Sequence, residues 1–222
     1  YMWLGTLWVM NRDGSDLKKL ADGIVASKGS VFEYPIWSAD SRALTYIKSI
    51  AKPSPTPGGA KEEVSYTRYE YHTVAIDSSV DVVLFTEDRE GMYISLLGYS
   101  VQNTLLYSLW STGKPLELWQ AAAAGGSPRL VTSLPKGMGL QLLSPDRSKL
   151  IYGSEAEGVG YMSVDGKERK RLDLKGAPRI IGWSSNPAEV IVGDRWGYGW
   201  ANYKALDIST GGMRDIAVPK PS

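Results

Sequence analysis

The stretch Trp37-Ser38-Ala39-Asp40-Ser41-Arg42-Ala43-Leu44-Thr45-Tyr46 decides the fold class. It reads as the end of an apolar strand, a Ser-x-Asp turn and the start of a second strand. Related phrases, each followed by a β-rich run, occur at residues 97–100, 143–146 and 182–185. The intervals from Ser100 to Ser144 and from Ser144 to Ser184 are 44 and 40 residues, close to the roughly 40–45 residues of a four-stranded propeller blade. A unit this small cannot bury its own apolar face, so the repetition predicts stacked sheets.

The repeats predict an all-β chain, a β-propeller built of four-stranded antiparallel blades. Glycine pairs or Asp-Gly pairs stand where the third and fourth strands of a blade must turn, because such turns need positive φ angles; they are Asp13-Gly14, Gly125-Gly126, Asp165-Gly166 and Gly211-Gly212. About five blades are expected, with approximate bounds 1–31, 32–88, 89–135, 136–176 and 177–222. The first blade lacks its first strand, so we expect a fragment of a six- to eight-bladed ring, in which open blade edges would favour an oligomer contact.

Composition excludes several classes of partner. The 222 residues carry 25 Lys and Arg against 24 Asp and Glu, a formal net charge of +1, which gives no electrostatic case for a nucleic acid or an anionic membrane surface. The absence of Cys excludes disulfides and thiolate metal sites. Residues 91–113 are uncharged, but Gln102 and Asn103 interrupt them, so they predict a buried β-hairpin rather than a helix that crosses a membrane.

The residues that could carry chemistry are better explained as structural. His72 is the only histidine and lies in the middle of a predicted strand, and no Gly-x-Ser-x-Gly elbow or phosphate-binding Gly loop is present. One His without Cys cannot build a zinc site, and calcium at the turns would need several more oxygen ligands. Asp13, Asp40, Asp146 and Asp165 recur at turn positions, where Asp accepts hydrogen bonds from backbone N–H groups. We therefore expect no catalytic constellation, cofactor or metal in this chain.

Residues 37–42, 143–148 and 7–15 resemble the repeats of TolB-like, WD40-like (PD40-type) β-propellers. The resemblance covers nearly the whole chain and implies the propeller architecture. Such propellers occur as periplasmic scaffolds and as gating domains of prolyl-oligopeptidase-type serine peptidases, so the resemblance implies a periplasmic or extracellular place in the bacterial envelope. Residues 1–5 do not combine a basic region with a long apolar core, and we expect no signal peptide there.

Long loops are predicted to gather on one face. In an up-and-down blade, the loops from second to third strand and from blade to blade leave by one face, and the remaining turns leave by the other. Residues 22–31, the Pro-rich insertion 49–68, and residues 110–115 and 195–200 all belong to the first face. Tyr, Trp and Arg are the usual anchors of interfaces. The predicted binding residues are Tyr66, Arg68, Tyr69, Trp110, Arg195, Trp196, Tyr198 and Trp200; a structural alternative is that Trp196 and Trp200 only cap their strands.

The predicted function is a non-catalytic binding or scaffold module that recognises a protein or peptide through this loop-rich face. One alternative is the gating propeller of a serine peptidase, whose catalytic domain would lie outside this chain and carry the Gly-x-Ser-x-Gly elbow. A second alternative is a sugar-binding or polysaccharide-lyase-like propeller in which Trp196, Tyr198 and Trp200 stack on sugar rings. The shortage of His counts against a metal-dependent lyase.

Overall fold

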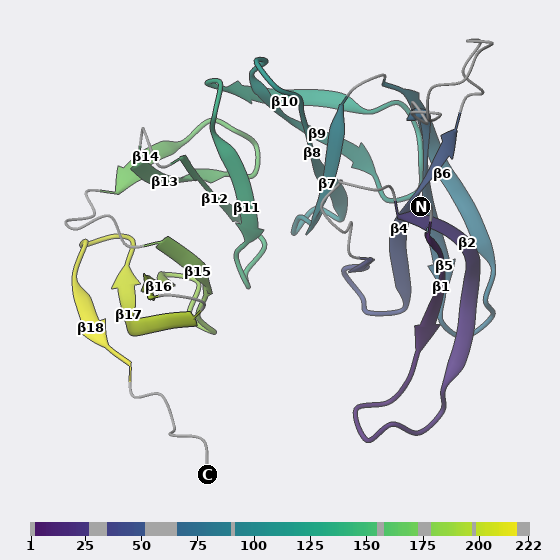
Figure 1. Ribbon diagram of the computed structural model, residues 1–222, viewed down its shortest axis with the longest axis horizontal. Coiled ribbons are helices and arrows are strands. Elements are labelled where there is room, and N and C mark those ends of the chain that lie inside the picture. The colour runs from purple at the N-terminus through teal and green to yellow at the C-terminus, as the bar shows by residue number, and fades with distance from the viewer. Residues whose placement is uncertain are drawn as a thin grey trace, which may run out of the picture. The chain divides into compact units, whose positions relative to one another are not determined.

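A computed structural model describes residues 3–26, 35–51, 66–89, 92–154, 158–172, 179–196 and 199–216. Strands β1 to β18 account for all the regular structure of these residues. The chain divides into two compact units, Tyr1–Ser133 (unit 1) and Leu134–Ser222 (unit 2), which are taken in turn (Figure 1).

Unit 1 contains one two-stranded and two four-stranded sheets (Figure 1). The antiparallel pair consists of β1 (Trp3–Val9) and β2 (Lys18–Ala26). The next sheet has the order β3 (Ile36–Trp37), β4 (Ala43–Ala51), β5 (Tyr66–Ala75) and β6 (Asp81–Asp88). The third contains β7 (Tyr93–Tyr99), β8 (Thr104–Trp110), β9 (Leu116–Ala122) and β10 (Arg129–Leu134), again in chain order, and only the last residue of β10, Leu134, falls in unit 2.

Unit 2 repeats the same plan twice. Its first sheet has the order β11 (Gly139–Leu143), β12 (Lys149–Ser154), β13 (Gly158–Ser163) and β14 (Arg169–Leu172). Its second sheet contains β15 (Arg179–Trp183), β16 (Glu189–Trp196), β17 (Gly199–Asp207) and β18 (Met213–Asp215). Neighbouring strands of both sheets pair antiparallel.

These sheets confirm the predicted fold class: an all-β chain of four-stranded antiparallel blades, preceded by an incomplete one. The uncharged segment 91–113 contains the hairpin of β7 and β8, as predicted, with Tyr93 opposite Trp110. In the part of the chain that the structure describes, no helix is long and apolar enough to cross a membrane.

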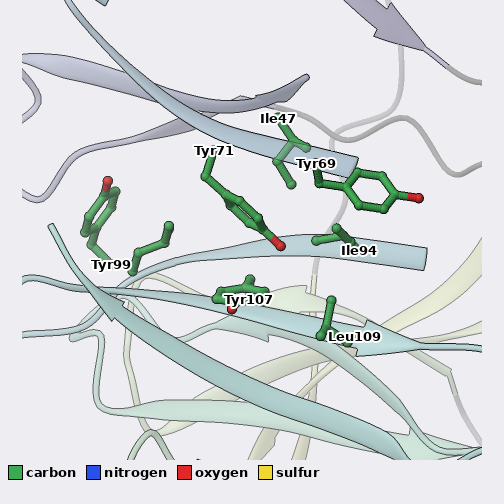
Figure 2. Packing of buried hydrophobic residues seen from close by; sticks show 8 residues of the cluster. Ile47, Tyr69, Tyr71, Ile94, Tyr99, Tyr107 and Leu109 are labelled. Carbon is green, nitrogen blue, oxygen red and sulfur yellow. The ribbon is translucent and has the colours of Figure 1, made fainter. Parts of the chain in front are cut away.

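The largest core of unit 1 fills the space between the β3–β6 sheet and the β7–β10 sheet (Figure 2). Tyr71 from β5 and Tyr107 from β8 project into this space with ring centroids 5.0 Å apart, and Phe85 stacks on Tyr71 at 4.1 Å. A buried hydrogen bond of 2.6 Å between the hydroxyls of Thr45 and Tyr99 joins the two sheets. Tyrosine suits this core because its ring is apolar and its hydroxyl can reach a polar partner.

Other clusters of buried side chains among the described residues hold further sheets together. Leu7 and Leu20 of the β1–β2 pair pack with Leu44, Tyr46 and Val74 of the β3–β6 sheet. In unit 2 the core between its two sheets is formed by Ile151, Leu172, Val190, Val192, Leu206 and Ile208. Burying one Leu, Ile or Val side chain completely stabilises a fold by about 1.5–3 kcal/mol, so these faces account for the stacking of the sheets.

The repeated turns are stabilised by hydrogen bonds between their own residues. Ser38 Oγ donates to Asp40 Oδ1 at 2.7 Å, and that oxygen also accepts the backbone N–H of Arg42 at 3.1 Å. Ser144 and Asp146 repeat the side-chain bond at 2.6 Å. The hydrogen bond from Ser38 and that from the Arg42 backbone lower the pKa of Asp40. The prediction that the turn aspartates accept local hydrogen bonds is therefore confirmed.

Candidate functional site

Each four-stranded sheet has two different ends. We call the end at which the second strand connects to the third the loop end; it includes the β4–β5, β8–β9, β12–β13 and β16–β17 connections. The opposite end, with the Ser-x-Asp turns, is the turn end. The predicted binding residues were assigned to loop ends.

The turn end of unit 1 contains a cavity of about 550 Å³, lined by Ser38, Ala39, Asp40, Arg42, Ala43, Thr73, Ala75, Asp77, Tyr99, Asn103 and Ala123. Two of its polar groups already have partners within the fold. Asp40 accepts the hydrogen bonds of its own turn, and the Tyr99 hydroxyl bonds to Thr45. Local folding thus accounts for the Asp40 carboxylate and the Tyr99 hydroxyl.

At the loop end of unit 1, Trp110 forms an aromatic pair with Tyr93. The two residues lie opposite each other on β8 and β7, and their rings stack with centroids 4.2 Å apart and planes inclined by 20°. Tyr93 is 38% exposed and Trp110 is half-buried. Because each ring fixes the other, the pair offers a rigid flat surface at little cost in conformational entropy.

Arg68 and Tyr69 begin the described side chains of β5 at the same end. Arg68 is exposed and lies opposite Ile50 on β4 and Asp88 on β6. Tyr69 is only 9% exposed and belongs to the core, and its hydroxyl donates to the Met92 carbonyl at 3.0 Å. This bond ties the start of β5 to the residue before β7, so Arg68 and Tyr93 lie at the same end of adjacent sheets.

The buried carboxylate of Glu87 links the two four-stranded sheets of unit 1. The side chain of Glu87 is 8% exposed and accepts hydrogen bonds from Tyr71 at 3.0 Å and Tyr107 at 2.9 Å. The Arg89 guanidinium lies 3.7 Å from Glu87 and 4.9 Å from the ring centre of Trp119. Burial, together with the nearby Glu87 charge, raises the pKa of Tyr107, so this hydroxyl stays a donor.

Sequence reasoning did not find Tyr93, Glu87, Arg89 or Trp119. Tyr93 could have been found, because it lies opposite Trp110 in a hairpin that the sequence predicts. Glu87 gave no such signal, because its partners come from β5 and β8 and only the packed sheets bring them together.

For four of the remaining predicted binding residues the structure describes the backbone but not the side chain, and the fifth is not described. Tyr66 pairs with Ala51 at the start of β5. In unit 2, Arg195 pairs with Trp200, and Trp196 with Gly199, across β16 and β17. The side chains of Tyr66, Arg195, Trp196 and Trp200, and the whole of Tyr198, lie outside the described structure. Their role in binding stays a prediction, as does the expectation that they share one face with Arg68 and Trp110.

His72 is held in a polar chain on the β4–β6 strands. Its Nδ1 lies 3.0 Å from Asp81 and its Nε2 lies 3.1 Å from Glu70, while Tyr46 donates to Asp81 at 2.7 Å. Burial acts to raise the pKa of Asp81, but hydrogen bonds from Tyr46 and His72 and the nearby Lys48 charge lower it overall. Both ring nitrogens have partners, which supports the structural role predicted for His72. No cluster of three or more His, Asp or Glu side chains suited to a metal ion occurs within the described ranges.

Unit 2 has a smaller cavity, of about 210 Å³, on its first sheet. It is lined by Leu134, Pro135, Met138, Tyr152, Gly158, Val159, Arg169 and Arg171. Two guanidinium groups and a phenol on an otherwise apolar wall suit an anionic group.

Solved structures share this fold of four-stranded antiparallel sheets. The crystal structure of TolB from Acinetobacter baumannii matches with a TM-score of 0.62 and 17% sequence identity, over 95% of this chain and 48% of that chain. The fold is that of a TolB-like β-propeller. An oligogalacturonate lyase in complex with manganese has a TM-score of 0.66 and 12% identity, over 96% of this chain and 59% of the lyase.

The TolB-like fold also occurs in larger chains. A Mycobacterium tuberculosis puromycin-hydrolyzing peptidase matches with a TM-score of 0.54 and 15% identity, over 92% of this chain and 31% of the peptidase. The present chain thus spans about half the length of the TolB and lyase structures that it resembles. The sequence matches no protein-family model and no curated protein. At these identities the likeness defines the fold alone.

Proposed function

We propose that this propeller is a non-catalytic module that binds a protein or peptide partner through its loop ends. The observation that carries the proposal is the stack of the exposed Tyr93 on the half-buried Trp110, at the same end as the exposed Arg68. Aromatic and arginine side chains on a rigid base supply most of the binding energy in protein interfaces. We also propose a periplasmic or extracellular location in the bacterial envelope, on the strength of the TolB-like fold.

The contacts of Glu87, Arg89 and Trp119 near the stack support a role in binding rather than in catalysis. Glu87 is already bonded to two tyrosines, and Arg89 lies over Trp119, so these groups fix one another. A surface that is ordered before the partner arrives loses less conformational entropy on binding. We infer that the loop end of unit 1 binds with little rearrangement.

The experiment that tests this function is selection of peptides from a random phage-displayed library on the full chain. Selected peptides are then titrated against Arg68→Ala and Trp110→Ala, with Arg42→Ala at the turn end as the matched control. Removing an interface anchor typically costs about 2 kcal/mol or more, so the first two variants should weaken binding by at least roughly 30-fold. Peptides that bind both variants like the parent, but lose affinity for Arg42→Ala, would show that the wrong end was chosen.

A further inference from the structure

A row of three residues crosses the first sheet of unit 2. Tyr152 on β12 lies opposite Gly160 on β13, and Gly160 lies opposite Arg171 on β14. Residues directly opposite one another in a sheet share a face, so only a glycine separates the phenol from the guanidinium. A Cβ at Gly160 would lie 2.6 Å from both Cζ and Oη of Tyr152. The tyrosine ring therefore lies across the glycine, in the space that a side chain would fill.

A second glycine places the guanidinium of Arg171. Gly158 has a φ of +79°, and a Cβ there would lie 3.4 Å from Nη2 and 3.6 Å from Nε of Arg171. Gly158 and Gly160 are two residues apart on β13 and so lie on the same face of the sheet. The two glycines thus leave room for the Tyr152 ring and the Arg171 guanidinium, and both of these side chains line the cavity of about 210 Å³, which we call the slot.

The slot is positively charged. Arg169 lies on the same strand face as Arg171, two residues earlier, and both line the cavity of about 210 Å³. Arg169 has a partner of its own, whereas the Arg171 guanidinium makes no hydrogen bond or ion pair with another described residue. Lys170 points the other way and donates to the Ser209 carbonyl at 3.0 Å.

The shape and chemistry of the slot limit what it can hold. A volume of about 210 Å³ corresponds to roughly seven water molecules at about 30 Å³ each, enough for one side chain or one chain end. Leu134, Pro135 and Met138 form an apolar wall beside the charged groups. A guanidinium binds a carboxylate through two parallel hydrogen bonds, and the wall suits the methylene groups that carry it.

We propose that this slot binds a carboxylate of the peptide partner, either an Asp or Glu side chain or the chain's C-terminal carboxylate. This inference rests on the proposed function and adds an acidic preference to it. Arg171 binds the carboxylate, Tyr152 donates a hydrogen bond or packs on the adjacent methylenes, and Gly158 and Gly160 give these two side chains the room to lie as they do.

The test uses the full chain and labelled peptides in fluorescence anisotropy. The probes are a peptide of alternating Glu and Tyr, its counterpart of alternating Gln and Tyr with a free C-terminus, and the same Gln peptide with a C-terminal amide. Variants Arg171→Gln and Tyr152→Phe are compared with Arg12→Gln, an exposed arginine in a turn of unit 1. Circular dichroism shows whether each variant keeps its β-sheet signal.

We expect Arg171→Gln to weaken binding of a carboxylate probe by about ten-fold or more and Arg12→Gln to leave it unchanged. Loss with the Glu peptide assigns a side-chain carboxylate, whereas loss only with the free-ended Gln peptide assigns the chain end. Equal binding of all three probes, or no effect of Arg171→Gln, overturns the inference, although peptides selected at the loop end of unit 1 would still support the proposed function. Binding of trigalacturonate with no binding of any peptide overturns both.

Discussion

Replacing Tyr107 by Phe tests whether the buried carboxylate holds the two sheets of unit 1 together. Tyr107 is 0% exposed and its hydroxyl donates to Glu87 at 2.9 Å. A hydrogen bond to a charged group contributes about 1.5–3 kcal/mol. Tyr71 still donates to Glu87 at 3.0 Å and Arg89 lies 3.7 Å away, so the carboxylate is not left alone. We therefore expect the free energy of unfolding to fall by about 2 kcal/mol.

For a chain of this length, about 2 kcal/mol corresponds to a fall in Tm of roughly 4–8 °C. Urea denaturation followed by circular dichroism and calorimetry would measure both quantities. Tyr161→Phe is the matched control, because Tyr161 also packs against a core and its hydroxyl makes no hydrogen bond with a described residue. Combining Tyr107→Phe with Glu87→Gln should give less than the sum of the two losses. Equal losses in Tyr107→Phe and the control, or simple additivity, would refute the reasoning.

Three other predictions concern packing and turns. Gly160→Ala should lower stability by about 1–3 kcal/mol, seen as a lower urea midpoint, because its Cβ would lie 2.5 Å from the Lys170 carbonyl oxygen and 2.6 Å from Cζ of Tyr152. An unchanged midpoint would contradict this close packing. Leu118→Ala, in a fully buried site, should cost about 2–5 kcal/mol. Hydrogen bonds from Ser163 and Lys167 lower the pKa of Asp165 from 3.8 to about 2. Its contribution to stability should therefore disappear as the pH falls from about 4 to about 2, and a plot of Tm against pH should be flatter for Asp165→Asn.

Repetition made the architecture predictable. The Ser-x-Asp phrase marks the same turn in the β3–β6 and β11–β14 sheets, and the turn hydrogen bonds of Asp40 and Asp146 explain why those residue types recur. The Asp-Gly and Gly-Gly turns then predict where the third and fourth strands of a blade meet. Local patterns of this kind need no knowledge of distant residues.

The candidate site was predicted less completely, because it depends on contacts between sheets. Sequence placed Arg68 and Trp110 at the loop end, where the structure has them. It could not show that Tyr69 is a core residue rather than a surface residue. The Tyr69 ring lies in the core, and its hydroxyl donates to the Met92 carbonyl, 23 residues further along the chain. Exposure is decided by what packs on a strand, and a period of two gives only the face on which a side chain lies.

The self-contained hydrogen bonds of the Ser-x-Asp turns also bear on how such a chain can change during evolution. Ser38, Asp40, Arg42 and Ala43 satisfy one another within six consecutive residues. A duplicated gene segment that encodes a whole blade therefore brings the hydrogen bonds of this turn with it, and only contacts such as those of Lys18 with the Ile76 and Asp77 carbonyls have to be matched by the neighbouring blade. Gains and losses of single blades should be tolerated in this lineage, while the other end is free to diversify in length and composition.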